Sequence, residues 1–286
     1  MKKVTIALAT IALCSACFGG TDNVPKVSSE QKAAAAQAAA AQAQPHTAQA
    51  TSTCAFTFTS GSDNTFLQYC VTANGNIAQL ATPFAREYIA VGTVGEGYGI
   101  CDTTNSSFYF DYADFGDSGN WGPATVVSHD QRTVKIVRTT SDGNWTLTQT
   151  ITRPEETQTV KVTMALRNNT SSDRLAFLLR YADVDVSGTF INNFDATLVS
   201  AFGWDSFGSN TPPFGLMMQN VASNSTTTLR AIPFAQNVGE PPNPCVPGAH
   251  LVFGPVLGTD GAIVMSYDGT VQKGRTKTAA LTYRGM

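Results

Sequence analysis

Residues 157–167 read TQTVKVTMALR, and apolar and polar side chains alternate along this stretch. In an extended chain one face carries the apolar residues Val160, Val162, Met164 and Leu166. A period of two residues is the signature of a β-strand that is buried on one face only. The stretch therefore predicts a half-buried strand in a sheet with one polar face.

Neighbouring segments extend this pattern. Residues 145–151 alternate in the same way, with threonines as the outer row, and residues 175–182 are almost continuously apolar, as in a strand covered on both faces. Shorter candidate strands lie at 125–128, 132–138, 196–202, 215–220, 262–267 and 277–283. Since no segment after residue 50 shows a helical period, we predict an all-β fold over residues 51–286, a large antiparallel β-sandwich.

Charged residues are scarce in this chain. The 286 residues include 18 Lys and Arg and 21 Asp and Glu, or 14%, against roughly 25% in average soluble proteins. The 37 threonines and 24 glycines favour strands and turns and supply the uncharged polar surface. Because the formal net charge is -3, the chain lacks the basic surface that attracts phosphates, and we expect no nucleic-acid partner.

The N-terminus has the three parts of an export signal: Lys2 and Lys3, an apolar run over residues 4–13, and a short segment of small residues that ends at Cys17. This end resembles the lipobox of bacterial lipoproteins, which implies a signal peptide over residues 1–16 and acylation of Cys17. Cys14 stands where that family usually has leucine. Cleavage after Ala16 to give a soluble secreted protein is therefore the alternative.

Residues 17–50 are rich in Ala, Gln and Ser and have no apolar stripe, which predicts a low-complexity tether rather than a packed element. Together with the leader, this tether indicates an exported protein of the bacterial cell envelope. Its expected partner is the membrane. The N-terminal lipid would hold the protein at the outer membrane or the cell surface.

The order of features in residues 51–286 resembles galactose-mutarotase-like domains. The resemblance rests on residues 74–83, on the long strand that ends at residues 167–170, and on a last strand that runs from Gly274 to Arg284. It implies a β-supersandwich. The acid and base of true mutarotases have no recognisable counterparts in this sequence, so the resemblance implies no activity.

Four cysteines follow the leader, and an even number in an exported domain favours two disulfides. Folding residues 54–72 as a hairpin about Ser62 sets Cys54 opposite Cys70, which leaves Cys101 to pair with Cys245. Two other pairings are possible. A metal site is disfavoured because no cysteine pair has C-x-x-C spacing, and the nearness of His250 to Cys245 is weak evidence for a nucleophile.

Residues 183–188 read DVDVSG, which resembles the opening of a calcium-binding loop. The candidate ligands are Asp183, Asp185, Ser187 and Asp195. Phe194 stands where an EF-hand has its bidentate glutamate, so a calcium ion would be held by an irregular loop. The alternative is that the aspartates end a buried strand and that Ser187 belongs to an ordinary turn.

Residues 108–121 combine aromatic, acidic and amide side chains, the chemistry that binds sugar rings. The candidate ligand-binding residues are Asp111, Asp114, Asp117, Trp121 and, from a distant segment, Trp204. The alternative is that Phe108, Phe110 and Tyr112 are core residues of one strand and that the remainder is a loop.

The sequence contains none of the common hydrolase, zinc-protease or nucleotide-binding motifs, and we assign no catalytic residue. We favour a non-catalytic binding or structural module with carbohydrate as the ligand class. The alternative is a hydrolase or lyase that uses two of the carboxylates Glu87, Glu96, Asp111, Asp114 and Asp117. Arg180, in an apolar strand, is expected to form a structural salt bridge with another strand rather than a substrate clamp.

Overall fold

The computed structural model describes residues 54–89, 95–154, 158–205, 214–223, 225–252 and 254–286. These residues form antiparallel sheets and two short 3-10 turns, η1 (Asp63–Thr65) and η2 (Val186–Gly188), without an α-helix. The predicted all-β sandwich is thereby confirmed. The signal peptide (1–16), the tether (17–50) and Cys17 lie outside the described residues.

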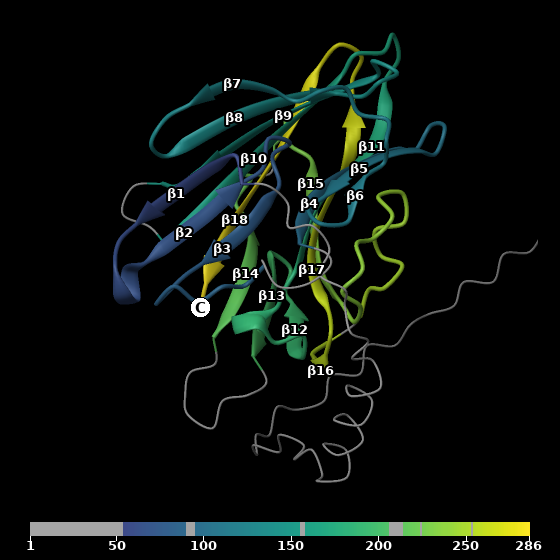
Figure 1. Cartoon of the computed structure of the whole chain (residues 1–286). Coiled ribbons are helices and arrows are strands. Elements are labelled where there is room, and N and C mark those ends of the chain that lie inside the picture. Colours follow the sequence, from purple (N-terminus) through teal and green to yellow (C-terminus); the bar gives the residue numbers. More distant parts are fainter. Residues whose placement is uncertain (1–53, 90–94, 155–157, 206–213, 224, 253) are drawn as a thin grey trace, which may run out of the picture.

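The largest sheet has nine strands (Figure 1). Their order is β16 (Val256–Thr259), β12 (Asn192–Ala196), β13 (Ser200–Asp205), β14 (Gly215–Asn220), β18 (Thr276–Gly285), β10 (Thr159–Asn168), β9 (Trp145–Thr152), β8 (Thr133–Thr139) and β7 (Thr125–His129). In β8, β9 and β10 buried residues alternate with half-exposed ones. One face of this sheet is therefore packed, and the other carries threonines such as Thr139 and Thr146, whose hydroxyl oxygens lie 3.0 Å apart.

Two smaller sheets contribute to the same core as the packed face. The six-stranded sheet has the order β15 (Arg230–Gln236), β17 (Ala262–Val271), β11 (Arg174–Asp183), β4 (Glu96–Asp102), β5 (Ser107–Tyr112) and β6 (Gly116–Asp117). The three-stranded sheet consists of β1 (Phe56–Ser60), β2 (Leu67–Val71) and β3 (Ile77–Ala81). The core joins residues of all three sheets, among them Tyr69, Ile100 and Val162.

The predicted strands match the structure except in one region. The stretch that predicts the fold is β10, and the nearly continuous apolar run is β11, whose last six residues are all buried. Residues 196–202, expected as one strand, instead comprise the end of β12, a turn and the start of β13. The chain reverses there because the Thr197 N–H donates to the Ser200 carbonyl at 2.7 Å.

Both predicted disulfides are present, Cys54–Cys70 and Cys101–Cys245. The hairpin register differs from the expected one, since Cys70 lies opposite Thr57 and not Cys54. The turn η1 takes up residues between the strands, and Cys54 reaches Cys70 from just before β1. Two disulfides indicate an exported protein. No helix of the described residues is long and apolar enough to cross a membrane.

Candidate functional site

Three of the predicted ligand-binding residues gather around Arg138 of β8. Its guanidinium donates to the carboxylate of Asp111, and its Nη2 lies 3.0 Å from the Asp117 carboxylate. Asp111 also accepts a hydrogen bond of 2.8 Å from the Asn74 amide. Burial raises the pKa of Asp111, and the charge of Arg138 acts against this rise. Asp111 thus points into the sandwich, where it has protein partners.

Trp121 belongs to the same buried group. Its indole N–H donates to the Phe110 carbonyl at 3.1 Å, and the Arg138 guanidinium lies 5.0 Å from the centre of an indole ring. Since only 9% of Trp121 is exposed, it offers little surface for stacking on a sugar. Its contacts link β5 to the nine-stranded sheet.

The other two predicted residues lie elsewhere. Asp114 is half-buried in the turn between β5 and β6, with a φ of 64°. Trp204 is on β13, in the nine-stranded sheet, and its ring lies 5.5 Å from that of Phe202. The structure therefore brings Asp111, Asp117 and Trp121 together but places Trp204 on a different sheet from β5.

A row of aromatic rings runs along the outer face of β5 and its following turn. It consists of Phe108, Phe110, Tyr112 and Phe115 and is called the aromatic row below. The planes of neighbouring rings differ by 5° between Phe108 and Phe110 and by 16° between Phe110 and Tyr112. The end members are open to solvent, because Phe108 is 40% and Phe115 is 49% exposed.

The interpretation of this segment as core is thus only partly correct. Phe108, Phe110 and Tyr112 do share one face of a strand, but only Tyr112 is buried. The loop after β15 covers Tyr112, whose hydroxyl donates to the Pro242 carbonyl at 2.9 Å. Alternating aromatics give the same sequence signal on a covered and on an open face. The sequence therefore pointed to residues 108–121 as a sugar-binding stretch but did not single out the phenylalanines as its binding residues.

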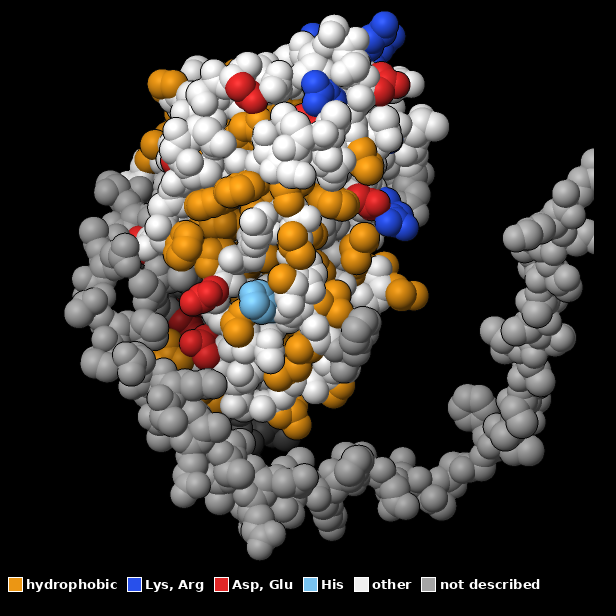
Figure 2. Space-filling model, turned by 90° about the vertical axis from the view of Figure 1, so that its right-hand side faces the viewer, with side chains coloured by type: hydrophobic (Ala, Val, Ile, Leu, Met, Phe, Trp, Pro, Cys, Tyr) orange, Lys and Arg blue, Asp and Glu red, His pale blue; other side chains and the backbone are white. Residues whose placement is uncertain are grey.

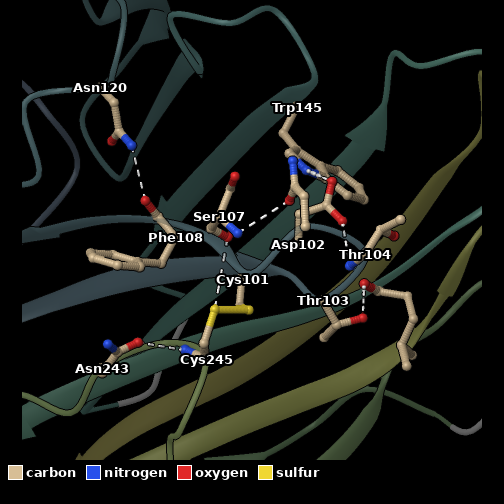
Figure 3. The surroundings of a disulfide bond; sticks show 12 residues. Cys101, Asp102, Thr103, Thr104, Ser107, Phe108, Asn120, Trp145, Asn243 and Cys245 are labelled. Carbon is tan, nitrogen blue, oxygen red and sulfur yellow. Dashed lines mark hydrogen bonds between the residues drawn. A yellow bond between two sulfur atoms is a disulfide. The ribbon is translucent and has the colours of Figure 1, made fainter.

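Polar amides flank the exposed end of the aromatic row. Figure 3 shows Asn120 and Asn243 on either side of Phe108. The Asn120 amide donates to the Phe108 carbonyl at 2.9 Å, and Asn243 accepts the Cys245 N–H at 2.8 Å. Because Cys245 is bonded to Cys101 of β4, which lies opposite Phe108, the disulfide holds this loop against β4, next to β5.

Figure 2 views the molecule from the side on which β5 and β6 lie in Figure 1. Hydrophobic side chains form a broad patch on this face, few Lys and Arg side chains interrupt it, and acidic side chains gather next to it. Scarce charge leaves this face suited to a neutral ligand.

The remaining carboxylates of the enzyme hypothesis have structural partners. Glu96 pairs with Arg180, and neither side chain is exposed, so the expected salt bridge of Arg180 with another strand is confirmed. Glu87 accepts the backbone N–H groups of Leu80 and Ile89, each at 2.9 Å. Both carboxylates thus hold the β3 and β4 segments in place.

The acidic residues of the predicted calcium loop are partly brought together. Carboxylate oxygens of Asp183, Asp185 and Asp260 lie within 4.8 Å of one another. Burial, followed by the neighbouring carboxylates, raises the pKa of Asp183 well above its usual range, and burial with Asp260 raises that of Asp185 to about 8. Sequence reasoning missed Asp260 because it lies in the distant turn between β16 and β17.

Ser187 and Asp195 have other surroundings. The Ser187 hydroxyl accepts a hydrogen bond from Arg86. Asp195 lies on strand β12 rather than in a loop, and its carboxylate accepts the Ala196 N–H at 2.7 Å. The residues from 183 to 195 therefore do not wrap around one point.

The fold is similar to that of known carbohydrate-active proteins. A bacterial glucoamylase complexed with acarbose matches with a TM-score of 0.52 at 10% identity, over 83% of this chain and 32% of the glucoamylase. The chain thus spans about a third of that protein's length, and the likeness concerns the fold alone.

Weaker similarities include galactose-mutarotase-related proteins. A candidate aldose 1-epimerase from Escherichia coli K12 has a TM-score of 0.44 at 11% identity, over 81% of this chain and 99% of the other. A galactose mutarotase related enzyme from Lactobacillus acidophilus has a TM-score of 0.42 at 6% identity, over 81% and 97%. No protein-family model matches the sequence, and the search of curated proteins finds no match.

Proposed function

We propose that this chain is an exported protein of the bacterial cell envelope whose β-sandwich binds carbohydrate without transforming it. The observation that carries the proposal is the aromatic row, with Phe108 and Phe115 exposed at its ends. Sugar rings present apolar C–H faces that pack on aromatic rings, while their hydroxyl groups bond to amides and carboxylates. Asn120 and Asn243 offer such groups beside the row.

The geometry of the row suits an extended glycan better than a single sugar. Ring centres of Phe108 and Phe110 are 6.1 Å apart, and those of Phe110 and Phe115 are 6.2 Å apart. Phe108 and Phe115 are exposed and Phe110 is half-buried, so a chain of sugar units would contact these three rings in turn. The fold is consistent with this ligand class, since it occurs in a glucoamylase complexed with acarbose.

The positions of the carboxylates favour binding over catalysis. A glycosidase needs two carboxyl groups on either side of a sugar bond, one acting as an acid. In this chain Asp111 and Asp117 share Arg138, and Glu96 is paired with Arg180. These pairings hold the carboxylates in structural roles, and an acid held in this way is poorly placed to meet a substrate.

The test is binding of the purified domain to a panel of soluble and insoluble polysaccharides. We expect Phe108→Ala and Phe115→Ala to weaken binding by tenfold or more, because each exposed ring supplies a stacking contact. The matched control is Leu198→Ala, which removes an apolar side chain that is 94% exposed on the turn between β12 and β13. Binding unchanged in both phenylalanine variants would refute the proposed site.

We further propose that the domain is held at the membrane by acylation of Cys17, with residues 17–50 as the tether. The lipobox-like leader supports this anchor, and several acyl chains would make it stable. Cys17→Ser should move the protein from the membrane fraction to the soluble fraction of the bacterium. Mass spectrometry of the mature N-terminus distinguishes acylated Cys17 from the soluble alternative.

A further inference from the structure

A group of buried oxygen atoms lies where β11 ends against the turn between β16 and β17. Asp183 is 7% and Asp185 is 1% exposed. Within the described residues, Asp183 Oδ1 and both carboxylate oxygens of Asp185 have no hydrogen-bond partner, and no Lys or Arg forms an ion pair with either residue. Burying carboxylates without a donor or a positive charge is strongly unfavourable.

Two neutral amides supply an independent observation. Gln236 and Asn192 are both 0% exposed, and Gln236 Oε1 and Asn192 Oδ1 have no partner among the described residues. The hydrogen bonds of the amide nitrogen fix the orientation of each side chain. The Gln236 nitrogen donates to the carbonyls of Val238 and Glu240, and the Asn192 nitrogen donates to two carbonyls as well. Exchanging N and O in either amide would set oxygen against oxygen, so the end without a partner is the oxygen in both residues.

The strand register brings these amides to the carboxylates. Gln236 and Asp183 both lie opposite Ala262, on β15 and β11, so their side chains leave the same face of the sheet on either side of this small residue. Asn192 lies opposite Thr259, next to Asp260 in the chain, and its nitrogen contacts the carbonyl of Val184, between Asp183 and Asp185.

A loop closes over the same group. A Cβ atom on Gly239 would lie 2.7 Å from Asp260 Oδ1 and 3.2 Å from Asp183 Oδ2, so the backbone passes directly over both carboxylates. The Tyr181 hydroxyl donates to the Gly239 carbonyl and fixes the loop there. The carboxylates are thus covered by backbone as well as by neighbouring side chains.

We propose that Asp183, Asp185 and Asp260, together with the amide oxygens of Gln236 and Asn192, bind a calcium ion. The donors are all oxygens, which suits a hard cation, whereas zinc prefers His and Cys. Two ligands of one calcium ion can lie up to about 5 Å apart, since each bond is about 2.3–2.6 Å long. The spacing of the three carboxylates, within 4.8 Å, agrees with this limit. Mg²⁺ bonds are shorter and demand a regular octahedron.

Such an ion would join the end of β11, the turn between β16 and β17, and the loop around Gly239. The same loop continues toward Cys245 and lies beside the aromatic row. The ion would therefore have a structural role. Its tests measure stability and metal binding, whereas the carbohydrate-binding proposal is tested by glycan binding, so each can fail without the other.

The first test compares thermal unfolding of the purified domain after EDTA treatment and dialysis with unfolding in millimolar calcium. A ligand that binds only the folded state stabilises it, so we expect calcium to raise Tm by about 5 °C or more. Magnesium at the same concentration should raise it less. Equal Tm values with and without calcium would overturn the proposal.

Single substitutions test whether the calcium-dependent rise in Tm arises at these carboxylates. Asp185→Asn and Asp260→Asn should weaken calcium binding at least tenfold and remove the rise in Tm. Asp185→Asn should also raise the Tm of the metal-free protein, because it relieves repulsion between buried carboxylates. Asp195→Asn is the matched control and should retain the full calcium response. A response that persists in both Asp185→Asn and Asp260→Asn would exclude this site.

Terbium luminescence gives a direct readout that does not depend on stability. Terbium replaces calcium at oxygen sites and is sensitised by a nearby tyrosine. The Tyr181 hydroxyl contacts the carbonyl of Gly239, which lies against the carboxylates of Asp183 and Asp260. We expect emission that calcium displaces and that Tyr181→Phe reduces. Absence of calcium-displaceable emission from the folded protein would contradict the proposal.

Discussion

The carboxylate of Glu96 and the guanidinium of Arg180 pair across β4 and β11 in the interior of the sandwich, and neither side chain has exposed surface. Each oxygen of Glu96 has a further donor, the Tyr283 hydroxyl at 2.7 Å and the Ile77 N–H at 2.6 Å. Arg180 also donates to Gln149 and to the Gly75 carbonyl. This network joins all three sheets at one point, which makes it the polar centre of the core.

Breaking this pair should strongly destabilise the domain. Glu96→Gln leaves a buried guanidinium without its counter-charge, and we expect a loss of about 3–5 kcal/mol in the free energy of unfolding. Arg180→Met should have a similar effect. The double variant Glu96→Leu/Arg180→Met should lose less than the sum of the single variants, and urea unfolding measures all of them. Additive losses would contradict a direct pairing.

The two disulfides should contribute unequally to stability. Cys101 and Cys245 are separated by 144 positions and Cys54 and Cys70 by 16. In the chain-entropy model these loops correspond to about 5 and about 3 kcal/mol. We expect Cys101→Ser/Cys245→Ser to lower the urea midpoint more than Cys54→Ser/Cys70→Ser. The opposite order would show that native-state contacts outweigh loop length.

Replacing Trp121 and replacing Phe108 by alanine should have different effects on stability and on glycan binding. Trp121 is 9% exposed and donates its N–H to Phe110, so Trp121→Ala should lower the free energy of unfolding by about 3–5 kcal/mol. Phe108→Ala removes an exposed ring and should change stability little but weaken glycan binding. Calorimetric unfolding together with binding measured on the folded fraction separates these effects. Lost affinity in folded Trp121→Ala protein would reassign this indole to the ligand site.

Acid should remove a stabilising contribution of Asp142. Burial alone would raise the pKa of Asp142, but hydrogen bonds from Thr140 at 2.6 Å and from Tyr109 and Asn144 outweigh it and lower the pKa. A carboxyl whose pKa is lowered by folding stabilises the protein above its unfolded pKa of about 3.9. This stabilisation is lost as the pH falls through the folded pKa.

Asp142→Asn tests this dependence. The variant should be less stable than the parent at pH 7. The difference should shrink towards zero as the pH falls below the unfolded pKa of about 3.9 and through the lowered folded pKa, where Asp142 itself becomes neutral. Urea midpoints over this pH range check the prediction. A difference of constant size would show that the effect arises from packing and not from the charge.

The periodicity of the sequence predicted most strands, and the count and spacing of the cysteines predicted both disulfides. These features are local or nearly so. Alternation determines which residues of a strand share a face. In β10 the apolar residues form the buried face, and the threonines show that the other face is not packed in the core. Arg180 likewise lies in an otherwise apolar run, and this position by itself indicated that its guanidinium needs a buried partner.

Tertiary structure decided which side chains meet and which faces stay open. Phe108 and Tyr112 lie on the same face of β5, yet a loop more than a hundred residues later covers only Tyr112. Asp183 and Asp185 were visible as a pair in the sequence, but Asp260 joins them only because β17 pairs with β11. The period of a strand shows which of its residues share a face, but it does not show which strands lie beside it. Strand order arises from burial of all the apolar faces at once, so the open aromatic row and the third carboxylate could be found only in the folded chain.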